Sequence, residues 1–596
     1  MSGTEQHVML PHCMLESKSL QWHECSARDV GEAVVAAMAA GGIDHLFFTS
    51  GSDIVFYQEA IAKLQLKPGP SVRLVTVPHE HVSLNAALGY AAVTGKPTAT
   101  AVHVDVGTQH YGAAVHTAFR SGLPVLVTAG APPTAPTGTM RGGRDEGGHL
   151  WLQQTFDQNS IVRQYMKWDH RLEFQDNPGM TVSRALQVAL TEPRGPVYLS
   201  IPREVAFRSI ERTTFPSAAQ LGIPRPPAAD PEGIRELAKR LVEARNPYVV
   251  VSHSGRDPAA VPALVSLCEL LGLAVVDGAS RAYLSFPMDH PLYLGDASLA
   301  EADVVVALDA IVPWIPGTKQ PSLETYVCVI GIDPIALNIP TYEFTAHMRL
   351  AATPRLAIEA LRNAAGSMLS DADRRRIAER TSRLAVGSSD LRQSAERDAR
   401  AAATTAPIDP RWLSYEISRN LDDNCILFDE TTPGAALKPL LRCSRPGSYF
   451  ANPGSSGGWS PGAAFGAKLA APDRDVIAAT GDGFYMFGAA GIALWAAARH
   501  SAPIMVVVYQ NRSYSTGTVR LAQTYPDGYA LRGQCEGGYF DPPIDFAKEA
   551  EAAGAYGENV RDPMEIGAAL ARGRDQLRRG RPAVIAVWLP RLLCSD

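Results

Sequence analysis

The chain places a carboxylate and an amide where they could bind a metal–diphosphate group. Asp482 follows the apolar run "DVIAATG", and Asn511 follows "APIMVVVYQ" 29 residues later. If these runs are neighbouring parallel strands, their carboxyl ends share one sheet edge, where open α/β sheets bind ligands. A carboxylate, an amide oxygen and the carbonyl of Ser513 are hard ligands that suit Mg²⁺, while Gly481 and Gly483 let backbone N–H groups approach phosphate oxygens. The same residues are also typical of an ordinary capped turn.

A second acid stands at the end of an apolar run nearer the N-terminus. Glu80 follows "VRLVTVPH" and precedes the alanine-rich helical pattern "HVSLNAALGYAAVTG". A glutamate at a helix start is favoured by the helix dipole alone, so its position has a structural explanation as well as a catalytic one.

Together these motifs resemble those of thiamine-diphosphate-dependent enzymes, in the group that includes acetolactate synthases, benzoylformate decarboxylases and 2-hydroxyacyl-CoA lyases. The Gly-Asp-Gly turn, the helix, the apolar strand and the asparagine turn resemble the family's diphosphate motif, with Gln510-Asn511 where the family usually has Asn-Asn. The segment "PHEHV" resembles the family's His-Glu segment and stands about 400 residues earlier, in the expected order. The resemblance extends over almost the whole chain and implies thiamine diphosphate and Mg²⁺ as cofactors.

The resemblance implies a role for each motif residue. Glu80 would contact N1′ of the aminopyrimidine and so promote loss of the C2 proton. Asp482, Asn511 and the carbonyl of Ser513 would be the metal ligands. The residues implied to bind the cofactor are Glu80, Thr431, Thr432, Gly481, Asp482, Gly483, Phe484, Asn511, Ser513 and Tyr514.

Two further catalytic residues follow from the resemblance to benzoylformate decarboxylases. His103 stands four residues before Gly107 and would take a proton-shuttle role, and Ser52 in "FFTSGS" would match an active-site serine. A core histidine satisfied by backbone groups is the competing interpretation of His103. The alternative histidines are His79, His81 and His110, and the residues expected on the substrate side are Gln154, Ile492 and Ala493.

The sequence also departs from the family pattern. Many members bend the cofactor over a bulky Met or Leu, but "NPGSSGGWSPG" has Ser456 or Gly457 in that slot, so Trp459 or another residue would replace the support. Ala493 in "GIALW" stands where many synthases have a glutamate, so water or His103 would relay the proton. The central region lacks the "GARFDDR"-like pattern that accompanies structural FAD, and FAD is therefore not expected.

Apolar runs alternate with helix-length segments along most of the chain, which predicts the α/β class with three consecutive doubly wound parallel-sheet domains. The predicted parts are an N-terminal extension at 1–26, a pyrimidine-binding domain at 27–210, a central nucleotide-fold-like domain at 228–366, a helical linker at 367–407 and a diphosphate-binding domain at 408–596. In the family, cofactor sites form between the first domain of one chain and the third of another, which implies a homodimer or homotetramer.

Composition argues against several other classes. With 596 residues and a net charge of -6, the chain gives no electrostatic case for binding nucleic acid. No apolar run approaches the roughly 20 residues that span a bilayer, and the first residues lack the pattern of a signal peptide. Eight scattered cysteines without a CxxC pair suit a reducing compartment. We therefore expect a cytoplasmic protein that acts on a small molecule.

The expected reaction makes or breaks a carbon–carbon bond next to a carbonyl. Non-oxidative decarboxylation of a 2-oxo acid, or an acyloin-type condensation, is favoured, and cleavage of a 2-hydroxyacyl-CoA to formyl-CoA and a ketone or aldehyde is the alternative. A non-catalytic relative that only binds the cofactor is the hypothesis from another class. An NAD enzyme is disfavoured because no strand ends in GxGxxG.

Overall fold

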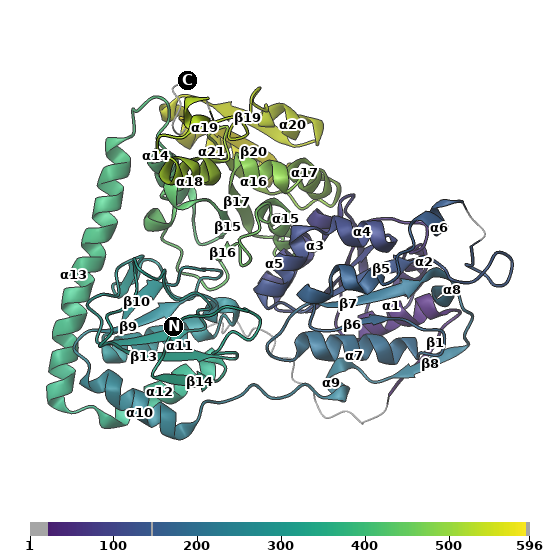
Figure 1. The fold of residues 1–596 in the computed structure, drawn as a ribbon, viewed down its shortest axis with the longest axis horizontal. Coiled ribbons are helices and arrows are strands. Elements are labelled where there is room, and N and C mark those ends of the chain that lie inside the picture. Colours follow the sequence, from purple (N-terminus) through teal and green to yellow (C-terminus); the bar gives the residue numbers. More distant parts are fainter. Residues whose placement is uncertain (1–21, 145–146, 534, 592–596) are drawn as a thin grey trace, which may run out of the picture.

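The alternation of apolar runs and helical segments produces three six-stranded sheets (Figure 1). The computed structural model describes residues 22–144, 147–533 and 535–591. Neighbouring strands in all three sheets are parallel, which confirms the predicted α/β class. Most of the predicted N-terminal extension lies outside the described residues. None of the described helices is both long and apolar enough to cross a membrane.

The first sheet has the strand order β3-β2-β4-β5-β7-β6. The chain first adds β3 on one side of β2 and then adds β4 and the later strands on the other side, while all strands stay parallel. Its strands are β2 His45–Phe48, β3 Arg73–Thr76, β4 Thr98–Val102, β5 Val125–Ala131, β6 Asp169–Arg171 and β7 Val197–Pro202. Its helices are α1 Val30–Ala40, α2 Phe56–Gln65, α3 Glu80–Thr94, α4 Val104–His110, α5 Ala113–Ser121, α6 His149–Leu152, α7 Pro178–Leu190, α8 Arg203–Ala206 and α9 Ala218–Leu221. Just outside the predicted limits of this domain, β1 (His23–Ser26) pairs antiparallel with β8 (Arg212–Phe215).

The central sheet, β11-β10-β9-β12-β13-β14, packs mainly around its own apolar core. Its strands are β9 Pro247–Val251, β10 Ala274–Asp277, β11 Tyr293–Gly295, β12 Val304–Leu308, β13 Tyr326–Gly331 and β14 Met348–Ala351, and its helices are α10 Pro231–Glu243, α11 Ala260–Leu271 and α12 Pro354–Met368. The charged segment predicted as a linker contains one long helix, α13 (Asp371–Ala401), which runs along one side of the molecule towards the third sheet (Figure 1).

The third sheet has the order β16-β15-β17-β18-β20-β19, which places the strands before Asp482 and Asn511 next to each other. Its strands are β15 Cys425–Glu430, β16 Tyr449–Ala451, β17 Asp475–Gly481, β18 Met505–Gln510, β19 Tyr556–Val560 and β20 Ala583–Trp588. Its helices are α14 Pro410–Asn420, α15 Ser460–Ala470, α16 Asp482–Phe487, α17 Ala490–Arg499, α18 Ser515–Thr524, α19 Tyr529–Arg532, α20 Phe546–Ala552 and α21 Ile566–Arg578.

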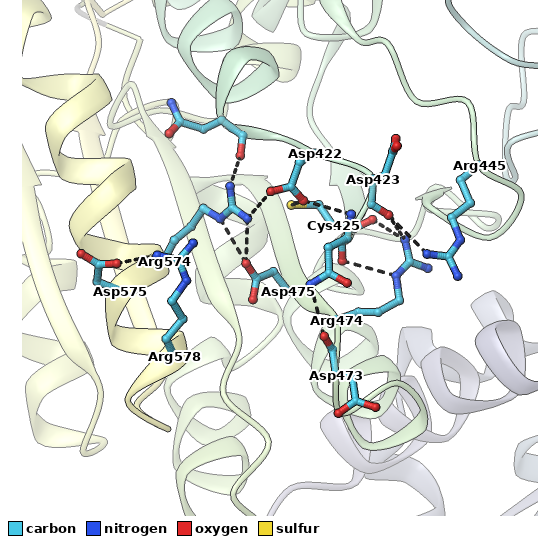
Figure 2. Close-up of polar contacts among 12 residues, drawn as sticks. Asp422, Asp423, Cys425, Arg445, Asp473, Arg474, Asp475, Arg574, Asp575 and Arg578 are labelled. Atoms are coloured by element: carbon cyan, nitrogen blue, oxygen red, sulfur yellow. Dashed lines mark hydrogen bonds and ion pairs between the residues drawn. The ribbon is translucent and has the colours of Figure 1, made fainter. Parts of the chain in front are cut away.

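A polar network fastens the amino ends of β15 and β17, at the edge opposite Asp482 (Figure 2). Arg574 of α21 donates hydrogen bonds to Asp422 at 2.6 Å and to Asp475 at 2.8 Å. Arg474 donates to the carbonyl of Cys425 at 2.6 Å. These contacts fix the strand starts and leave the carboxyl ends free to present functional groups.

Helices α3 and α15 join the first and third domains with almost no side chain between them. A Cβ on Gly89 would lie 1.9 Å from the carbonyl oxygen of Ala463, and one on Gly466 would lie 1.8 Å from that of Ala86. Only glycine permits such approach of two backbones. The apolar residues of both helices therefore belong to one continuous core that spans the two domains.

Candidate functional site

The predicted acid–amide corner forms at the carboxyl ends of β17 and β18. The two strands are parallel neighbours, with Gly481 opposite Tyr509. Asp482 begins α16 and is only 3% exposed. Its Oδ2 accepts a hydrogen bond from the backbone N–H of Arg512 at 2.5 Å, and its Oδ1 accepts one from that of Gly483 at 2.8 Å. The structure thus brings Asp482 against the turn that contains Asn511.

The turn after β18 has a specific backbone shape. Arg512 has a φ of 58°, in the left-handed region, and this reverses the chain directly beside the carboxylate. The Oδ1 atom of Asn511 accepts hydrogen bonds from the backbone N–H and the hydroxyl of Ser513, each at 3.0 Å. Ser513 is buried, and Asn511 is half-buried. All three predicted metal-ligand residues therefore lie within one compact corner.

Electrostatics make this corner a favourable place for a cation. Burial raises the pKa of Asp482 to about 7, although the hydrogen bonds from Arg512 and Gly483 act in the opposite direction. A bound divalent cation would stabilise the ionised carboxylate that burial disfavours. The carboxylate, amide and carbonyl oxygens offered here are the donor types that Mg²⁺ prefers. The residues present therefore fit a Mg²⁺–diphosphate group.

A glycine loop precedes α15, and a buried carboxylate fixes its end. Glu430, the last residue of β15, accepts hydrogen bonds at 2.9 Å from the backbone N–H groups of Trp459 and Ser460. Burial raises the pKa of Glu430 despite these hydrogen bonds. Trp459 packs in the core against Phe428, with ring centroids 5.2 Å apart, so it does not face the loop opening. In the sequence, Glu430 directly precedes Thr431 and Thr432.

Phe484 lies where a side chain on the glycine loop would be. Gly457 has a φ of 69°, and a Cβ there would lie 3.0 Å from the Phe484 ring. On the other side of the corner, the ring of Tyr514 packs on Phe540 with centroids 4.6 Å apart, above Gly483. Two aromatic side chains thus flank the Gly-Asp-Gly turn, and sequence spacing alone did not reveal this arrangement.

The two threonines lie at the carboxyl end of β15, on the same sheet edge. Thr431 donates hydrogen bonds to Asp429 from its backbone N–H at 3.0 Å and from its hydroxyl at 2.8 Å. Thr431 and Thr432 are both half-buried. Both threonines are therefore placed at the edge where the Gly-Asp-Gly turn ends β17.

In the first domain, Glu80 is the first residue of α3 and contacts a histidine. Nδ1 of His110 donates to Glu80 Oε2 at 2.5 Å, and the Glu80 side chain is 13% exposed. His79 packs near His110, with ring centroids 4.4 Å apart, so that one ligand atom from each of the three residues lies within 4.8 Å of the others. His81 is instead a core histidine: Nδ1 lies 3.3 Å from the carbonyl of Tyr111, and Nε2 lies 3.0 Å from Asn85 Nδ2 and 3.2 Å from the carbonyl of Gly458.

His103 is held between two oxygen acceptors. Its Nδ1 contacts the fully buried carboxylate of Asp53, and its Nε2 contacts Gln153 Oε1 at 2.9 Å. Ser52, next to Asp53, is exposed on the turn. Gln154 contacts Arg144 rather than His103 and lines a cavity of about 480 Å³. The two residues that contact His103, Asp53 and Gln153, are the sequence neighbours of Ser52, the expected catalytic residue, and Gln154, the expected substrate-side residue.

An acid from another helix lies beside the helix that was expected on the substrate side. Ala493 is completely buried in the core, and Ile492 is half-buried beside it. A Cβ on Gly491 would lie 2.7 Å from Oε1 of Glu549, which comes from α20. Burial raises the pKa of Glu549. An acid therefore does lie beside α17, but a later segment of the chain contributes it.

Three parallel sheets with a buried acid at the carboxyl ends of β17 and β18 define an α/β protein of the kind that binds ligands at strand ends. Two family models match the chain: "Thiamine pyrophosphate enzyme, N-terminal TPP binding domain" at residues 28–161, and "Thiamine pyrophosphate enzyme, C-terminal TPP binding domain" at residues 432–587. The chain belongs to the family of thiamine-diphosphate-dependent enzymes.

Curated relatives and solved structures agree with this family. A benzoylformate decarboxylase of Pseudomonas aeruginosa is 24% identical over 85% of this chain and 90% of its own length. A sulfoacetaldehyde acetyltransferase of Alcaligenes xylosoxydans is 25% identical over 94% of this chain and 93% of its own. The thiamine diphosphate-dependent 4-hydroxybenzoylformate decarboxylase of Rhodococcus jostii has the same fold, with a TM-score of 0.74 and 23% identity, over 95% of this chain and all of that one.

Proposed function

We propose that this protein is a Mg²⁺- and thiamine-diphosphate-dependent enzyme that decarboxylates a 2-oxo acid without oxidation, or condenses the resulting fragment with a carbonyl acceptor. The hydrogen bond from Arg512 to Asp482 is the observation that carries the proposal, because it unites the Gly-Asp-Gly turn with the asparagine corner in one buried, acidic site. The relatives named as decarboxylase and acetyltransferase support chemistry next to a carbonyl.

The proposed roles follow the donor types at each place. Asp482, Asn511 and the carbonyl of Ser513 hold the metal, and the diphosphate lies against the turn. When bound, thiamine diphosphate supplies a carbon nucleophile that attacks the substrate carbonyl and then accepts its electron pair. Glu80 binds the aminopyrimidine nitrogen, and His103 moves protons at the substrate. The further residues proposed to touch the cofactor are Thr431, Thr432, Gly481, Gly483, Phe484 and Tyr514.

We also propose that the complete site forms between chains in a homodimer or homotetramer. Exposed aromatic side chains in the segment that begins at the corner accord with a partner surface there: Tyr514, Tyr525 and Tyr529 are 54%, 61% and 87% exposed. Sedimentation velocity with and without thiamine diphosphate and Mg²⁺ measures the assembly. A monomer under both conditions would contradict a site shared between chains.

Turnover of defined donors tests the function. The protein is incubated with thiamine diphosphate, Mg²⁺ and, in separate arms, pyruvate, benzoylformate or a 2-hydroxyacyl-CoA, and products are measured by mass spectrometry. Product from a 2-oxo acid supports the proposal, whereas product only from the acyl-CoA replaces it with lyase activity. Tight cofactor binding without product from any donor would instead favour a non-catalytic relative.

A variant of the activating acid provides the internal check. Glu80→Gln keeps the shape of the side chain but removes its charge, so exchange of the cofactor C2 proton should be lost while cofactor binding is largely retained. Exchange is followed by NMR after transfer to deuterated buffer. Unchanged exchange in this variant would overturn the role of Glu80.

A further inference from the structure

We propose that Asp53 is a positioning residue which, together with Gln153, holds His103 as an imidazolium and so prepares it to donate a proton at the substrate-derived carbon. The chemical step rests on the proposed function, whereas the holding of the ring does not. Asp53 lies in no motif that the family resemblance supplied, and it is recognised from its contacts alone.

The contact between Asp53 and His103 is built into the fold. Asp53 follows β2, His103 follows β4, and these strands are parallel neighbours, so their carboxyl ends converge. Asp53 is 0% exposed, and its second oxygen accepts the backbone N–H of Val104 at 3.3 Å. A Cβ on Gly51 would lie 2.6 Å from His103 Cβ, and one on Gly130 would overlap the Asp53 carboxylate. Two glycines therefore make room for this pair.

The opposite ring nitrogen also faces an acceptor. Nε2 of His103 contacts Gln153 Oε1 at 2.9 Å, and a doubly protonated ring donates to the oxygen at each of its two nitrogens. Among the residues that the structure describes, the other ionisable groups near His103 are Asp105 of α4 and His149 of α6, whose ring centroid is 6.5 Å away. Burial lowers the pKa of His103, but the hydrogen bond and charge of Asp53, aided by Gln153 and Asp105, outweigh this and raise it.

His103 and the histidine that contacts the activating glutamate lie at the two ends of one short helix. His103 immediately precedes α4, and His110, which contacts Glu80, ends it. At 1.5 Å per residue the two histidines are roughly 10 Å apart along the axis. The helix therefore fixes the position of His103 relative to His110, and through the His110 contact relative to Glu80 on α3.

The proton transfer balances without any further reactant. After carbon dioxide leaves, the Nε2–H bond of His103 breaks and a C–H bond forms on the carbon that kept the electron pair. The ring becomes neutral and keeps its Nδ1 proton on Asp53, which fixes the tautomer. Because the His103 side chain is 20% exposed, water can return the proton to Nε2. Gln153 must release Nε2 when the substrate binds.

Asp53→Asn tests the pairing directly. In the full-length protein, the His103 ring is titrated by NMR with isotope-labelled histidine, and the resonance is assigned with His103→Asn. Loss of the Asp53 charge should lower the His103 pKa by about 1 unit or more. The alkaline limb of kcat/KM should move to lower pH by the same amount. Asp105→Asn is the matched control, because Asp105 stands only two residues from His103 but makes no hydrogen bond to its ring in the described structure, and its shift should be much smaller.

The outcomes separate the inference from the proposed function. An unchanged His103 pKa in Asp53→Asn overturns the inference even if a donor is turned over. A lowered pKa with no turnover of any donor supports the pairing while the proposed function fails. If Asp53→Asn does not fold, Gln153→Leu replaces it: removal of the second acceptor should lower the same pKa, and an unchanged value overturns the proposal.

Discussion

The carboxylate of Asp482 accepts a hydrogen bond from the backbone amide of Arg512, a residue 30 positions further along the chain. Because the φ of Arg512 is 58°, its amide points back towards the end of β17 while Asn511 and Ser513 remain beside the carboxylate. The hydrogen bond thus joins two turns that are separate in sequence into one oxygen-rich corner. It also explains how the chain keeps this corner assembled around a buried acid.

Asp482→Asn should strongly weaken metal-dependent cofactor binding. Changes to the partners of metal ligands alone cost about 10–100-fold in affinity, so loss of a direct ligand should weaken thiamine diphosphate binding by at least about 100-fold. Calorimetric titration with thiamine diphosphate in Mg²⁺ or in EDTA measures this. Asp475→Asn, at the opposite end of the same strand, is the control and should leave affinity nearly unchanged. Equal affinity in Asp482→Asn and the wild type would refute its role as a ligand.

His110→Ala should impair activation of the cofactor more than its binding. The histidine holds one oxygen of Glu80, so its loss lets the carboxylate rotate away from a productive position. We expect C2 proton exchange to slow by about tenfold, since small misplacements of reacting groups are costly. His110→Asn retains an N–H donor near the same place and should recover part of the rate. An unaltered exchange rate in His110→Ala would show that the contact is incidental.

Gly457→Ala should disturb both the loop and Phe484. The left-handed backbone alone costs a non-glycine residue about 1–3 kcal/mol of unfolding free energy. Gly447 has a φ of 72° with open space around its Cβ position, so Gly447→Ala isolates that backbone cost. Urea unfolding and cofactor titration compare the two. Gly457→Ala alone should weaken cofactor binding, because only there does the new methyl group meet the Phe484 ring; equal effects would contradict a link between them.

Arg574→Met should lower stability without changing cofactor affinity. Its loss leaves Asp475 and Asp422 without their charged donor, which costs about 2 kcal/mol of unfolding free energy. Arg578→Met removes an exposed pair with Asp575 and should cost less than about 1 kcal/mol. Figure 2 draws both arginines with their partners. Urea unfolding measures the difference, and similar values for the two variants would contradict it.

The same variant changes the dependence of stability on pH. Burial raises the pKa of Asp422, but the hydrogen bond and charge of Arg574 outweigh it, so the pKa is lowered on folding. A lowered carboxyl pKa stabilises the fold above the pKa of the unfolded chain, and this contribution is lost as pH falls through the folded value. The wild type should therefore lose more stability than Arg574→Met when the pH falls below about 4. Parallel unfolding curves against pH would contradict this.

The sequence predicted what depends on strand order and failed where side chains from separate segments meet. Parallel strands end at one edge, so the proximity of Asp482 and Asn511 follows from two apolar runs. No such rule states that Asp53, rather than Ser52, turns inwards to His103, or that Gln153 rather than Gln154 faces it. A shift of one residue in a turn reverses the direction of a side chain, and only the folded backbone fixes that direction.

The helix after the Gly-Asp-Gly turn illustrates the same limit. The sequence shows that Ala493 stands in place of the family's glutamate, but it does not show that Ala493 is buried in the core. Glu549, more than 50 residues later, lies over Gly491 because α20 packs beside α17. In the sequence, the only sign that Glu549 approaches α17 is the glycine at position 491. A single glycine is equally typical of a turn or a helix end.

The glycine contact between α3 and α15 has a consequence for protein engineering and for the evolution of this chain. Residues nearly 380 positions apart must change together, since a single added methyl group on Gly89 or Gly466 would push the two backbones apart. The central domain has its own core and could be exchanged between relatives as a cassette. The first and third domains could not be exchanged separately, so a functional chimera would have to take both of them from the same parent.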